Sequence, residues 1–439
     1  MRYLKFILLL IIMGGCNRHD QQALDVFMED KLVQWNHQLT DVIISDIFTP
    51  PQASRIYAYP NIAAYQVLRY QDPQEYPSLS HYFKDMKDTE APADSEVYLP
   101  LSAIVAFSTV AAQLVYNGPR ILELEGEFLK QTKDQGISQK VFNASVQYGQ
   151  QVAGQIWEWA QQDGYNQRTS KARFTVTKNP SRWEPTPPDY MDAIEPHWNT
   201  LRPFLLDSAG QFDPGPPVDF DTIPGSPFYE GTLEVYQTVN DLDEERLEIA
   251  KFWDCNPNIS YTQGHVMYYQ QQISPGGHWI HITTQVLQAE NLDLVQSAEV
   301  MSKVSATIAD AFISCWNEKY RSNLVRPETY INRYIDTEWK PILQTPAFPE
   351  HTSGHSVASA SAATMLTHLF GDNYAFSDST EVPFGLPTRH FNSFLKASEE
   401  AAISRLYGGI HYMPAITKGV EQGQAVGRFA VARFDKPIE

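Results

Sequence analysis

Nine prolines fall between positions 180 and 217, and this stretch divides the chain in two. A helix cannot persist through it, because proline lacks an amide hydrogen and clashes with the preceding turn. On either side, apolar residues recur at helical spacing over residues 20–70, 98–116, 141–163, 233–253, 294–320 and 399–407. Alternation of the strand type is nearly absent. The pattern predicts an all-α fold with two helical regions, residues 17–230, which end in the proline-rich loop, and residues 231–439.

Large aromatic residues bear on whether the proline-rich stretch is ordered. Trp183, Tyr190, Trp198 and Phe204 are scattered among the prolines. Side chains of this size carry much apolar surface, which is stabilised by burial. We therefore predict that the stretch is a loop held by packing against the helices, and not a free linker.

The composition excludes several classes of protein. Of 439 residues, 43% are hydrophobic and 19% charged, so the chain as a whole is not disordered. The 52 acidic residues outnumber the 33 basic residues, and the formal charge is −19. A field of that sign repels nucleic acid and anionic membranes, so no nucleic-acid partner is expected. An anionic ligand would need a local cationic pocket.

The start of the chain has the pattern of a targeting signal. A basic stretch, MRYLK, precedes an apolar run over residues 6–13 that is too short to cross a bilayer. Two glycines then precede Cys16, as in a bacterial lipobox, in which lipid is added to the cysteine. We predict a signal peptide over residues 1–15 and an exported lipoprotein, periplasmic or at the outer membrane or cell surface, anchored only through Cys16. The alternative is an ordinary signal peptide in which Cys16 is incidental.

The first of three cationic clusters is the segment KYRSNLVRP at 319–327. Lys319 and Arg326 are seven residues apart, or two helical turns, so we predict that both project from one face of a helix. Pro327 is then expected to end that helix. Taken alone, the cluster is equally well explained as a basic face in contact with solvent.

The second and third clusters also combine cations with helix ends. The second cluster is the segment PEHTSGH at 349–355, in which Ser353, Gly354 and His355 precede a run of small residues, where a helix should begin. The free N–H groups at a helix start suit an oxyanion, although an ordinary N-cap would use the same residues. Arg405 lies in the last turn of another predicted helix, which a pair of glycines ends, and His411 could fold back toward it.

Together the three clusters predict a binding pocket. One lysine, two arginines, a Ser-Gly helix start and two histidines would surround a small tetrahedral oxyanion with several charges. Such a concentration of cationic groups in a chain of charge −19 is not explained by solvation alone.

The three clusters resemble the superfamily of vanadium-dependent haloperoxidases and type 2 phosphatidic acid phosphatases. That superfamily carries Lys-x6-Arg-Pro, then Pro-Ser-Gly-His, then Ser-Arg followed by a histidine. The matching positions are Lys319, Arg326, Pro327, Ser353, Gly354, His355, Ser404, Arg405 and His411. The segments RWEPTPPDY, EPHWNTLRPF, IAKFWDCNP and PGGHWI are also similar to bacterial vanadium haloperoxidase homologues. The resemblance implies an all-α helical bundle of the haloperoxidase and acid phosphatase type.

The resemblance also implies a role for each matching residue. Vanadate would be the cofactor, held by Lys319, Arg326, Ser353, Gly354, Arg405 and His411, with His411 as the ligand of the metal. His355, Lys319 and His411 would be catalytic. His355 would act as acid and base on hydrogen peroxide, and Lys319 would polarise it. Halide would be oxidised to hypohalous acid, with iodide or bromide expected before chloride.

Three further residues are candidates for the lining of the pocket. Trp316 and Phe348 match aromatic residues that line the vanadate pocket of fungal chloroperoxidases, although packing in the core would explain either of them. His351, in the second cluster and four residues before His355, is the third candidate.

Two departures from the family pattern stand near the pocket. Thr352 replaces the proline that usually precedes Ser-Gly-His. Ala415 stands where many members have an aspartate that helps to hold the last histidine or its neighbouring arginine. The partner that would orient His411 is therefore not identified by the sequence.

Two other functions are consistent with the same sequence features. In a phosphatase, phosphate would occupy the same site, His411 would form a phosphohistidine and His355 would protonate the leaving alcohol. The lipid phosphatases of the superfamily carry membrane helices and the soluble ones are much shorter chains, so the haloperoxidase is favoured. A non-catalytic surface-binding lipoprotein would have no reason to keep three cationic clusters. The helical faces would permit a homodimer.

The remaining cysteines and histidines carry weaker signals. Cys255 and Cys315 could pair, but two cysteines do not make a disulfide framework. His278 and His281 have the i, i+3 spacing of metal ligands on a helix. No set of carboxylates or cysteines in the sequence completes them, so a structural role is expected for both.

Overall fold

The computed structural model describes residues 22–93 and 96–436, so the predicted signal peptide and Cys16 lie outside the described residues. Its α-helices are α2 (Lys31–Ser45), α3 (Pro50–Leu68), α4 (Leu99–Leu114), α5 (Gly118–Asp134), α6 (Gln139–Gln161), α7 (Pro227–Asn240), α8 (Glu244–Phe252), α9 (Pro275–Ala289), α10 (Leu294–Ser322), α11 (Pro327–Tyr334), α12 (Gly354–Phe370), α13 (Phe394–Tyr407) and α14 (Met413–Asp435). Two antiparallel hairpins pair β1 (Ser260–Gln263) with β2 (Val266–Tyr269) and β3 (Phe376–Asp378) with β4 (Arg389–Phe391). The predicted all-α class is confirmed.

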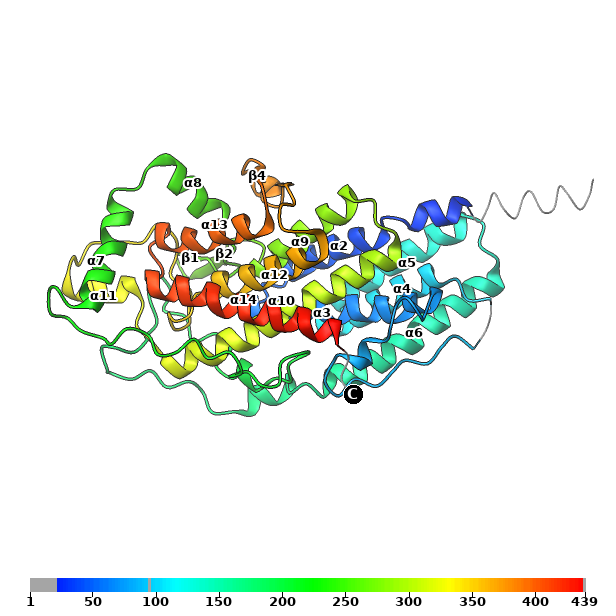
Figure 1. Cartoon of the computed structure of the whole chain (residues 1–439), viewed down its shortest axis with the longest axis horizontal. Coiled ribbons are helices and arrows are strands. Elements are labelled where there is room, and N and C mark those ends of the chain that lie inside the picture. Colours follow the sequence, from blue (N-terminus) through cyan, green and yellow to red (C-terminus); the bar gives the residue numbers. More distant parts are fainter. Residues whose placement is uncertain (1–21, 94–95, 437–439) are drawn as a thin grey trace, which may run out of the picture.

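The long helices α10, α12 and α14 run along the longest axis of an elongated molecule (Figure 1). Helix α10 packs against α3 and against α12, and most of its residues are buried, polar ones such as Ser305 and Thr307 among them. Helices α4, α5 and α6 lie at one end of the molecule, and α7 and α11 lie at the other end (Figure 1). The larger hydrophobic core extends from Leu24 to Ala430, and a smaller one includes residues of α7, α11 and α13.

Two of the predicted helical segments are interrupted. The segment at 20–70 breaks before α3, where the Gln52 side chain accepts the Thr49 N–H over 3.1 Å and Pro50 takes the first helical position. The segment at 233–253 breaks between α7 and α8, where the Asp243 carboxylate accepts a hydrogen bond from the Arg246 N–H. Both interruptions are caused by side chains that cap the start of the next helix. The spacing of apolar residues does not reveal such caps.

The proline-rich stretch is ordered by packing, as predicted. Trp183, Trp198 and Phe204 are buried, whereas Tyr190 is exposed. A buried carboxylate of α10, that of Asp310, accepts hydrogen bonds of 2.7–2.9 Å from three consecutive backbone N–H groups at 204–206. The stretch is therefore fixed to the central helix, since a buried carboxylate without such donors would be costly.

Helix α14 approaches α12 through glycines. Gly419, Gly423 and Gly427 recur at four-residue spacing, so they lie on one face of the helix. A methyl group added at Gly423 would lie 2.3 Å from the Val357 carbonyl oxygen of α12, far inside van der Waals contact. The two helices thus pack backbone against backbone.

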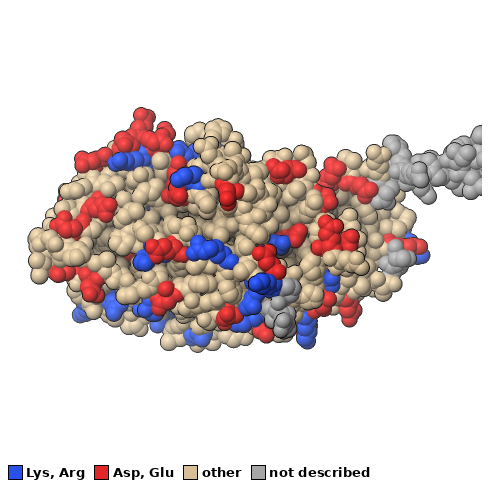
Figure 2. All heavy atoms as spheres, viewed as in Figure 1, with Lys and Arg blue, Asp and Glu red and all other residues tan. Residues whose placement is uncertain are grey.

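None of the helices in the described ranges is both long enough and apolar enough to cross a bilayer. On the face drawn in Figure 2, Lys and Arg side chains are interspersed with Asp and Glu side chains. That face therefore has no continuous basic patch of the kind that nucleic acid binds.

Candidate active site

Lys319 and Arg326 do not share a helix, which corrects the prediction from their spacing. Helix α10 ends at Ser322, and Asn323 follows in the left-handed conformation with φ of 47°. Arg326 is the N-cap residue of α11, and Pro327 begins that helix instead of ending the previous one. Asparagine tolerates the left-handed region, and proline is favoured at the first position of a helix, so both residues fit a boundary.

The proline-rich stretch positions the connection between these two helices. Leu324 pairs with Arg182 in an isolated antiparallel bridge, and the Trp183 N–H donates to the Asn323 carbonyl over 3.0 Å. On the other side, the Glu350 N–H donates to the Leu324 carbonyl over 3.1 Å. A segment far away in the sequence therefore fixes where Arg326 begins α11.

The side chains of Lys319 and Arg326 converge on one short segment in spite of this separation. The ammonium group of Lys319 donates to the carbonyls of Pro349 and Glu350, over 3.0 and 3.1 Å. Arg326 Nε donates to the Phe348 carbonyl over 3.0 Å. Both cations are completely buried, so these carbonyl oxygens replace part of the water that the cations lose.

Burial also shifts the protonation equilibria of the two cations. It lowers the pKa of Lys319 to about 7, and the nearby charge of Arg326 adds to the effect. It lowers the pKa of Arg326 to about 10. Arg326 Nη2 has no hydrogen-bond partner in the protein, which leaves a buried donor free for an anion.

His411 is held by a carboxylate that the sequence did not point to. Its Nδ1 lies 2.8 Å from Glu350 Oε1, which also accepts the Tyr412 N–H over 3.0 Å. Burial, with Arg326 next in effect, keeps the pKa of His411 well below its ordinary value, so the ring is neutral. The ring therefore donates from Nδ1, and the lone pair of Nε2 faces Arg326 Nη1 at 3.1 Å.

Glu350 thus orients His411 in place of the aspartate that is missing at Ala415. It lies in the second cluster, where no role was predicted for it, and the absence of a carboxylate at Ala415 was the signal that another one was needed. Burial raises the pKa of Glu350 to about 7, while Arg326 and Lys319 lower it. Ala415 contributes its carbonyl, which accepts the Ser353 N–H over 3.1 Å.

Helix α12 begins at the second cluster, as predicted. Ser353 is its N-cap residue, and its hydroxyl accepts the Ser356 N–H over 3.3 Å. A methyl group added at Gly354 would meet only Trp316 and Lys319, at ordinary contact distances of 3.7 and 3.9 Å. The protein itself therefore does not demand glycine there, and the open space beside the helix start suits a ligand.

His355 faces the same cavity as His411. The cavity is lined by Pro50, Cys255, Asn256, Pro275, Phe312, Trp316, Pro346, Phe348, Gly354, His355, Ile410 and His411. His355 Nε2 has no partner in the protein. Burial and the charge of Arg405 keep the pKa of His355 well below its ordinary value, so this nitrogen carries no positive charge at neutral pH.

Arg405 is buried beside the cavity, with partners in the last turn of α8 and in the residue that follows it. Its Nη2 donates to the carbonyls of Trp253 and Ala250, over 2.6 and 3.3 Å, and its Nε donates to the Ser404 hydroxyl over 2.9 Å. Its charge lowers the pKa values of both His355 and His411. The third cationic cluster therefore lies close to the second.

The two aromatic candidates line the cavity, and His351 does not. The rings of Trp316 and Phe348 lie 5.0 Å apart, and the Phe348 ring lies 4.9 Å from Lys319 Nζ. This distance permits a cation–π contact in a place where the cation has lost its water. His351 instead lines a neighbouring pocket beside Ala415, and burial lowers its pKa to about 4.

The hydroxyl of Thr352 replaces the packing of the usual proline with hydrogen bonds. It donates to the Gln422 side chain over 2.6 Å, and Gln422 Nε2 donates to the Ser314 hydroxyl over 3.0 Å. These contacts join the start of α12 to α14 and to α10, so the departure at Thr352 is accommodated.

The prediction that no carboxylate or cysteine completes His278 is wrong. His278 lies among Cys255, Asp378 and Glu381, which come from segments distant in the sequence. His281 turns elsewhere: its Nε2 lies 3.1 Å from the Thr40 hydroxyl, and its ring stacks on His37. Cys255 and Cys315 are both buried and free.

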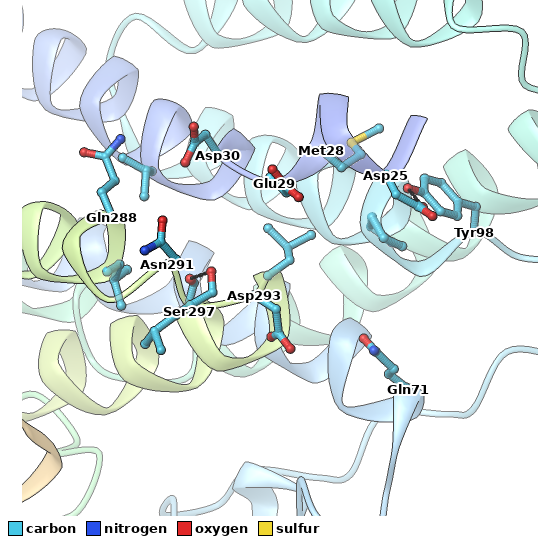
Figure 3. A pocket seen from close by; sticks show the side chains of 15 residues that line it. Asp25, Met28, Glu29, Asp30, Gln71, Tyr98, Gln288, Asn291, Asp293 and Ser297 are labelled. Carbon is cyan, nitrogen blue, oxygen red and sulfur yellow. Dashed lines mark hydrogen bonds between the residues drawn. The ribbon is translucent and has the colours of Figure 1, made fainter. Parts of the chain in front are cut away.

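A much larger hollow lies away from these residues. It has a volume of about 470 Å³, and several of its lining side chains are carboxylates, including those of Asp25, Glu29, Asp30 and Asp293 (Figure 3). None of the predicted site residues lines it. Its acidic lining would repel an oxyanion, so the smaller cationic cavity is the candidate active site.

The structure is similar to that of the first bacterial vanadium-dependent iodoperoxidase, with a TM-score of 0.87 and 45% sequence identity. The similarity covers 92% of this chain and 96% of that chain. The chain belongs to the vanadium-dependent haloperoxidase family. The family model of the VCPO second helical-bundle domain matches residues 299–439, which contain all three cationic clusters.

Two structures of bacterial vanadium-dependent chloroperoxidase share the fold at lower identity. The apo-type structure matches with a TM-score of 0.66 and 16% identity, over 87% of this chain and 93% of that chain. The holo-type structure matches with a TM-score of 0.63 and 15% identity, over 89% of this chain and 93% of that chain. No curated protein matches the sequence.

The pKa values near 7 predict how oxyanion binding depends on pH. Sulfate is a suitable probe because its charge does not change near neutral pH. Above pH 7, Lys319 loses its proton and Glu350 gains a negative charge, and both changes disfavour an anion. Sulfate affinity, measured by calorimetry, should be nearly constant below pH 7 and should fall by about tenfold or more for each pH unit above it.

Matched substitutions separate the groups responsible. Lys319→Arg keeps a permanent charge and should reduce the pH dependence, while Lys303→Arg, on the surface of the same helix, should leave it unchanged. An affinity that stays constant from pH 6 to pH 9 in the unsubstituted protein, or one that rises, would contradict the assignment of these two groups to the pocket.

Proposed function

We propose that this protein is a vanadate-dependent haloperoxidase that oxidises iodide, and bromide less readily, with hydrogen peroxide to hypohalous acid. The observation that carries the proposal is the 45% identity to a bacterial iodoperoxidase over 92% of the chain. The chemistry of the cavity agrees with it, because two of the residues that line it, His411 and Phe348, contact the buried cations Arg326 and Lys319.

The residues present fit vanadate. Arg326 Nη2 and His355 Nε2 are buried polar atoms without protein partners, and the space beside Gly354 is one that a Cβ would enter. His411 Nε2 would be the ligand of the metal, and Lys319, Arg326 and Arg405 would balance the negative oxygens. Vanadate, when bound, acts as a Lewis acid that activates hydrogen peroxide toward halide without a change of oxidation state.

Glu350 acts on His411 before any ligand arrives. By accepting the Nδ1 proton, it fixes the tautomer in which Nε2 has a lone pair. The neighbouring Tyr412 N–H holds the carboxylate in place. The nitrogen is therefore oriented toward Arg326 and the cavity in the free protein.

His355 is placed to take a proton from hydrogen peroxide. A general base must be unprotonated at the working pH, and the low pKa of His355 keeps its ring unprotonated. The same low pKa makes it a weak base in the empty protein. A negative oxyanion beside it would raise that pKa, so His355 would become a better base only when the pocket is filled.

The lining of the cavity favours a large, weakly hydrated halide. The aromatic rings of Phe312, Trp316 and Phe348 and the rings of three prolines line it. Transfer of an anion from water to such a surface costs least for iodide, whose hydration is the weakest of the three halides. Iodide is therefore the expected preferred substrate, followed by bromide.

The first experiment measures both activities that the pocket would support. Purified protein is stripped of metal and titrated with orthovanadate, and the oxidation of iodide and bromide by hydrogen peroxide is followed beside hydrolysis of para-nitrophenyl phosphate. Halide oxidation should require vanadate and should fall to the uncatalysed background in His411→Ala, which removes the ligand nitrogen. His368→Ala, at an exposed histidine of α12, serves as the control and should remain active.

The outcomes separate the two enzyme classes. Phosphate release that vanadate inhibits, without halide oxidation, would reassign the protein as a phosphatase acting through His411. If neither halide oxidation nor phosphate release is detected, both enzyme classes are excluded. The protein would then be an oxyanion-binding lipoprotein without catalytic activity.

Glu350 gives a second prediction about the cofactor. Glu350→Gln keeps the size of the side chain but removes the charge that orients His411, so vanadate should bind about 10- to 100-fold more weakly. The measurement is the vanadate concentration that restores half of the iodide oxidation. Glu318→Gln is the control, since Glu318 is also buried with a raised pKa but bonds to Arg321. Equal effects of the two substitutions would contradict the orienting role.

We propose in addition that the protein is exported and anchored by lipid at Cys16. The support is the sequence pattern alone, a short basic and apolar start followed by Gly-Gly-Cys. Cells fed with radioactive palmitate should label the protein, and Cys16→Ser should abolish the label and release the protein from the membrane fraction. Label retained in Cys16→Ser would refute the anchor. A homodimer remains a prediction.

A further inference from the structure

A second cluster of metal-ligating side chains lies beside the cavity. Cys255 follows α8, His278 lies in the first turn of α9, and Glu381 lies in the loop between β3 and β4. All three are at least 95% buried, and each directs a possible ligand atom toward the other two. These atoms are Cys255 Sγ, His278 Nδ1 and Glu381 Oε1.

The distances between the three atoms match the edges of a tetrahedral metal site. Sγ lies 3.3 Å from Nδ1, Nδ1 lies 3.1 Å from Oε1, and Sγ lies 3.8 Å from Oε1. Zinc bonds of about 2.3 Å to sulfur and about 2.1 Å to nitrogen and oxygen separate such ligands by about 3.3–3.6 Å. Adjustments of a few tenths of an ångström would therefore seat the ion.

The opposite side of the His278 ring is fixed in the way that metal-binding histidines usually are. His278 Nε2 lies 2.7 Å from Asp378 Oδ2, and Asp378 Oδ1 accepts the Thr380 N–H over 3.0 Å. The ring also stacks on Trp253, with centroids 4.6 Å apart. A carboxylate on the far nitrogen holds the ring orientation and directs the lone pair of Nδ1 at a metal.

The ligand chemistry also suits a divalent ion. A metal binds the thiolate of Cys255 and the neutral imidazole of His278, so both residues would release any proton they carry as the ion enters. The Glu381 carboxylate supplies a further negative charge.

We propose that Cys255, His278 and Glu381 bind a divalent transition metal ion, with zinc the best suited to this mixture of sulfur, nitrogen and oxygen ligands. Three protein ligands leave a fourth position for water. Cys255 also lines the cavity that His355 and His411 line, so the cluster lies beside the candidate active site.

The site would be structural for the neighbouring oxyanion pocket. Residues 250–255 supply the carbonyls of Ala250 and Trp253 that hold Arg405. An ion bound to Cys255 would tie this loop to α9 and to the β3–β4 loop, which otherwise meet only through side chains. It would therefore restrict the movement of the Arg405 guanidinium.

The test is a metal-binding assay on the purified protein without vanadate. The protein is equilibrated with zinc, separated from free metal by gel filtration and analysed for zinc, which should be present at about one ion per chain. Cobalt is then exchanged into the site, and absorption by thiolate-to-cobalt charge transfer reports a sulfur ligand. Cys255→Ser should lose that absorption and bind zinc at least tenfold more weakly, whereas Cys315→Ser, at the other buried free cysteine, should change neither.

Further variants locate the site independently of cysteine. Asp378→Asn should weaken zinc binding by about 10- to 100-fold, because it loosens His278 without removing a ligand. His281→Ala, three residues further along the same helix, should bind zinc normally. Less than one-tenth of an ion per chain and no cobalt–thiolate absorption in the unsubstituted protein would overturn the proposal, and so would full binding in Cys255→Ser.

Discussion

Lys319 and Arg326 have lost all contact with bulk water, and much of the surrounding structure compensates for that loss. The carbonyls of residues 348–350 and of Ile410 point at the two cations, and a carboxylate lies beside them. The compensation is incomplete, since Arg326 Nη2 has no partner. An anion in the cavity would supply the missing partner. The cations have already lost their water when the protein folds, so anion binding does not have to provide that desolvation energy.

The fold class and the convergence of the clusters could be predicted from the sequence because they depend on local patterns. Apolar periodicity located most helices, and the Ser-Gly-His motif located the start of α12. The shared helix face of Lys319 and Arg326 was wrong because spacing alone does not show that Asn323 takes the left-handed conformation. A seven-residue spacing is informative only while the helix is continuous.

Contacts over long sequence distances escaped prediction for a different reason. Glu350 and His411 are 61 residues apart, and His278 and Asp378 are 100 residues apart. Nothing in a single sequence pairs such residues, although a missing partner can be noticed. The absent aspartate at Ala415 showed that His411 needed a carboxylate, and the fold supplies it from the preceding loop.

The glycine face of α14 has a consequence for the practical use of the protein. Gly419, Gly423 and Gly427 admit no side chain against α12, so the inner face of the last helix cannot be altered. The opposite face is in water, with Thr417, Glu421, Arg428 and Ala432 exposed along four turns. A linker attached to this exposed face would immobilise the protein on a solid support through a rigid helix. The cavity lies on the other side of the α12–α14 pair and would not be disturbed.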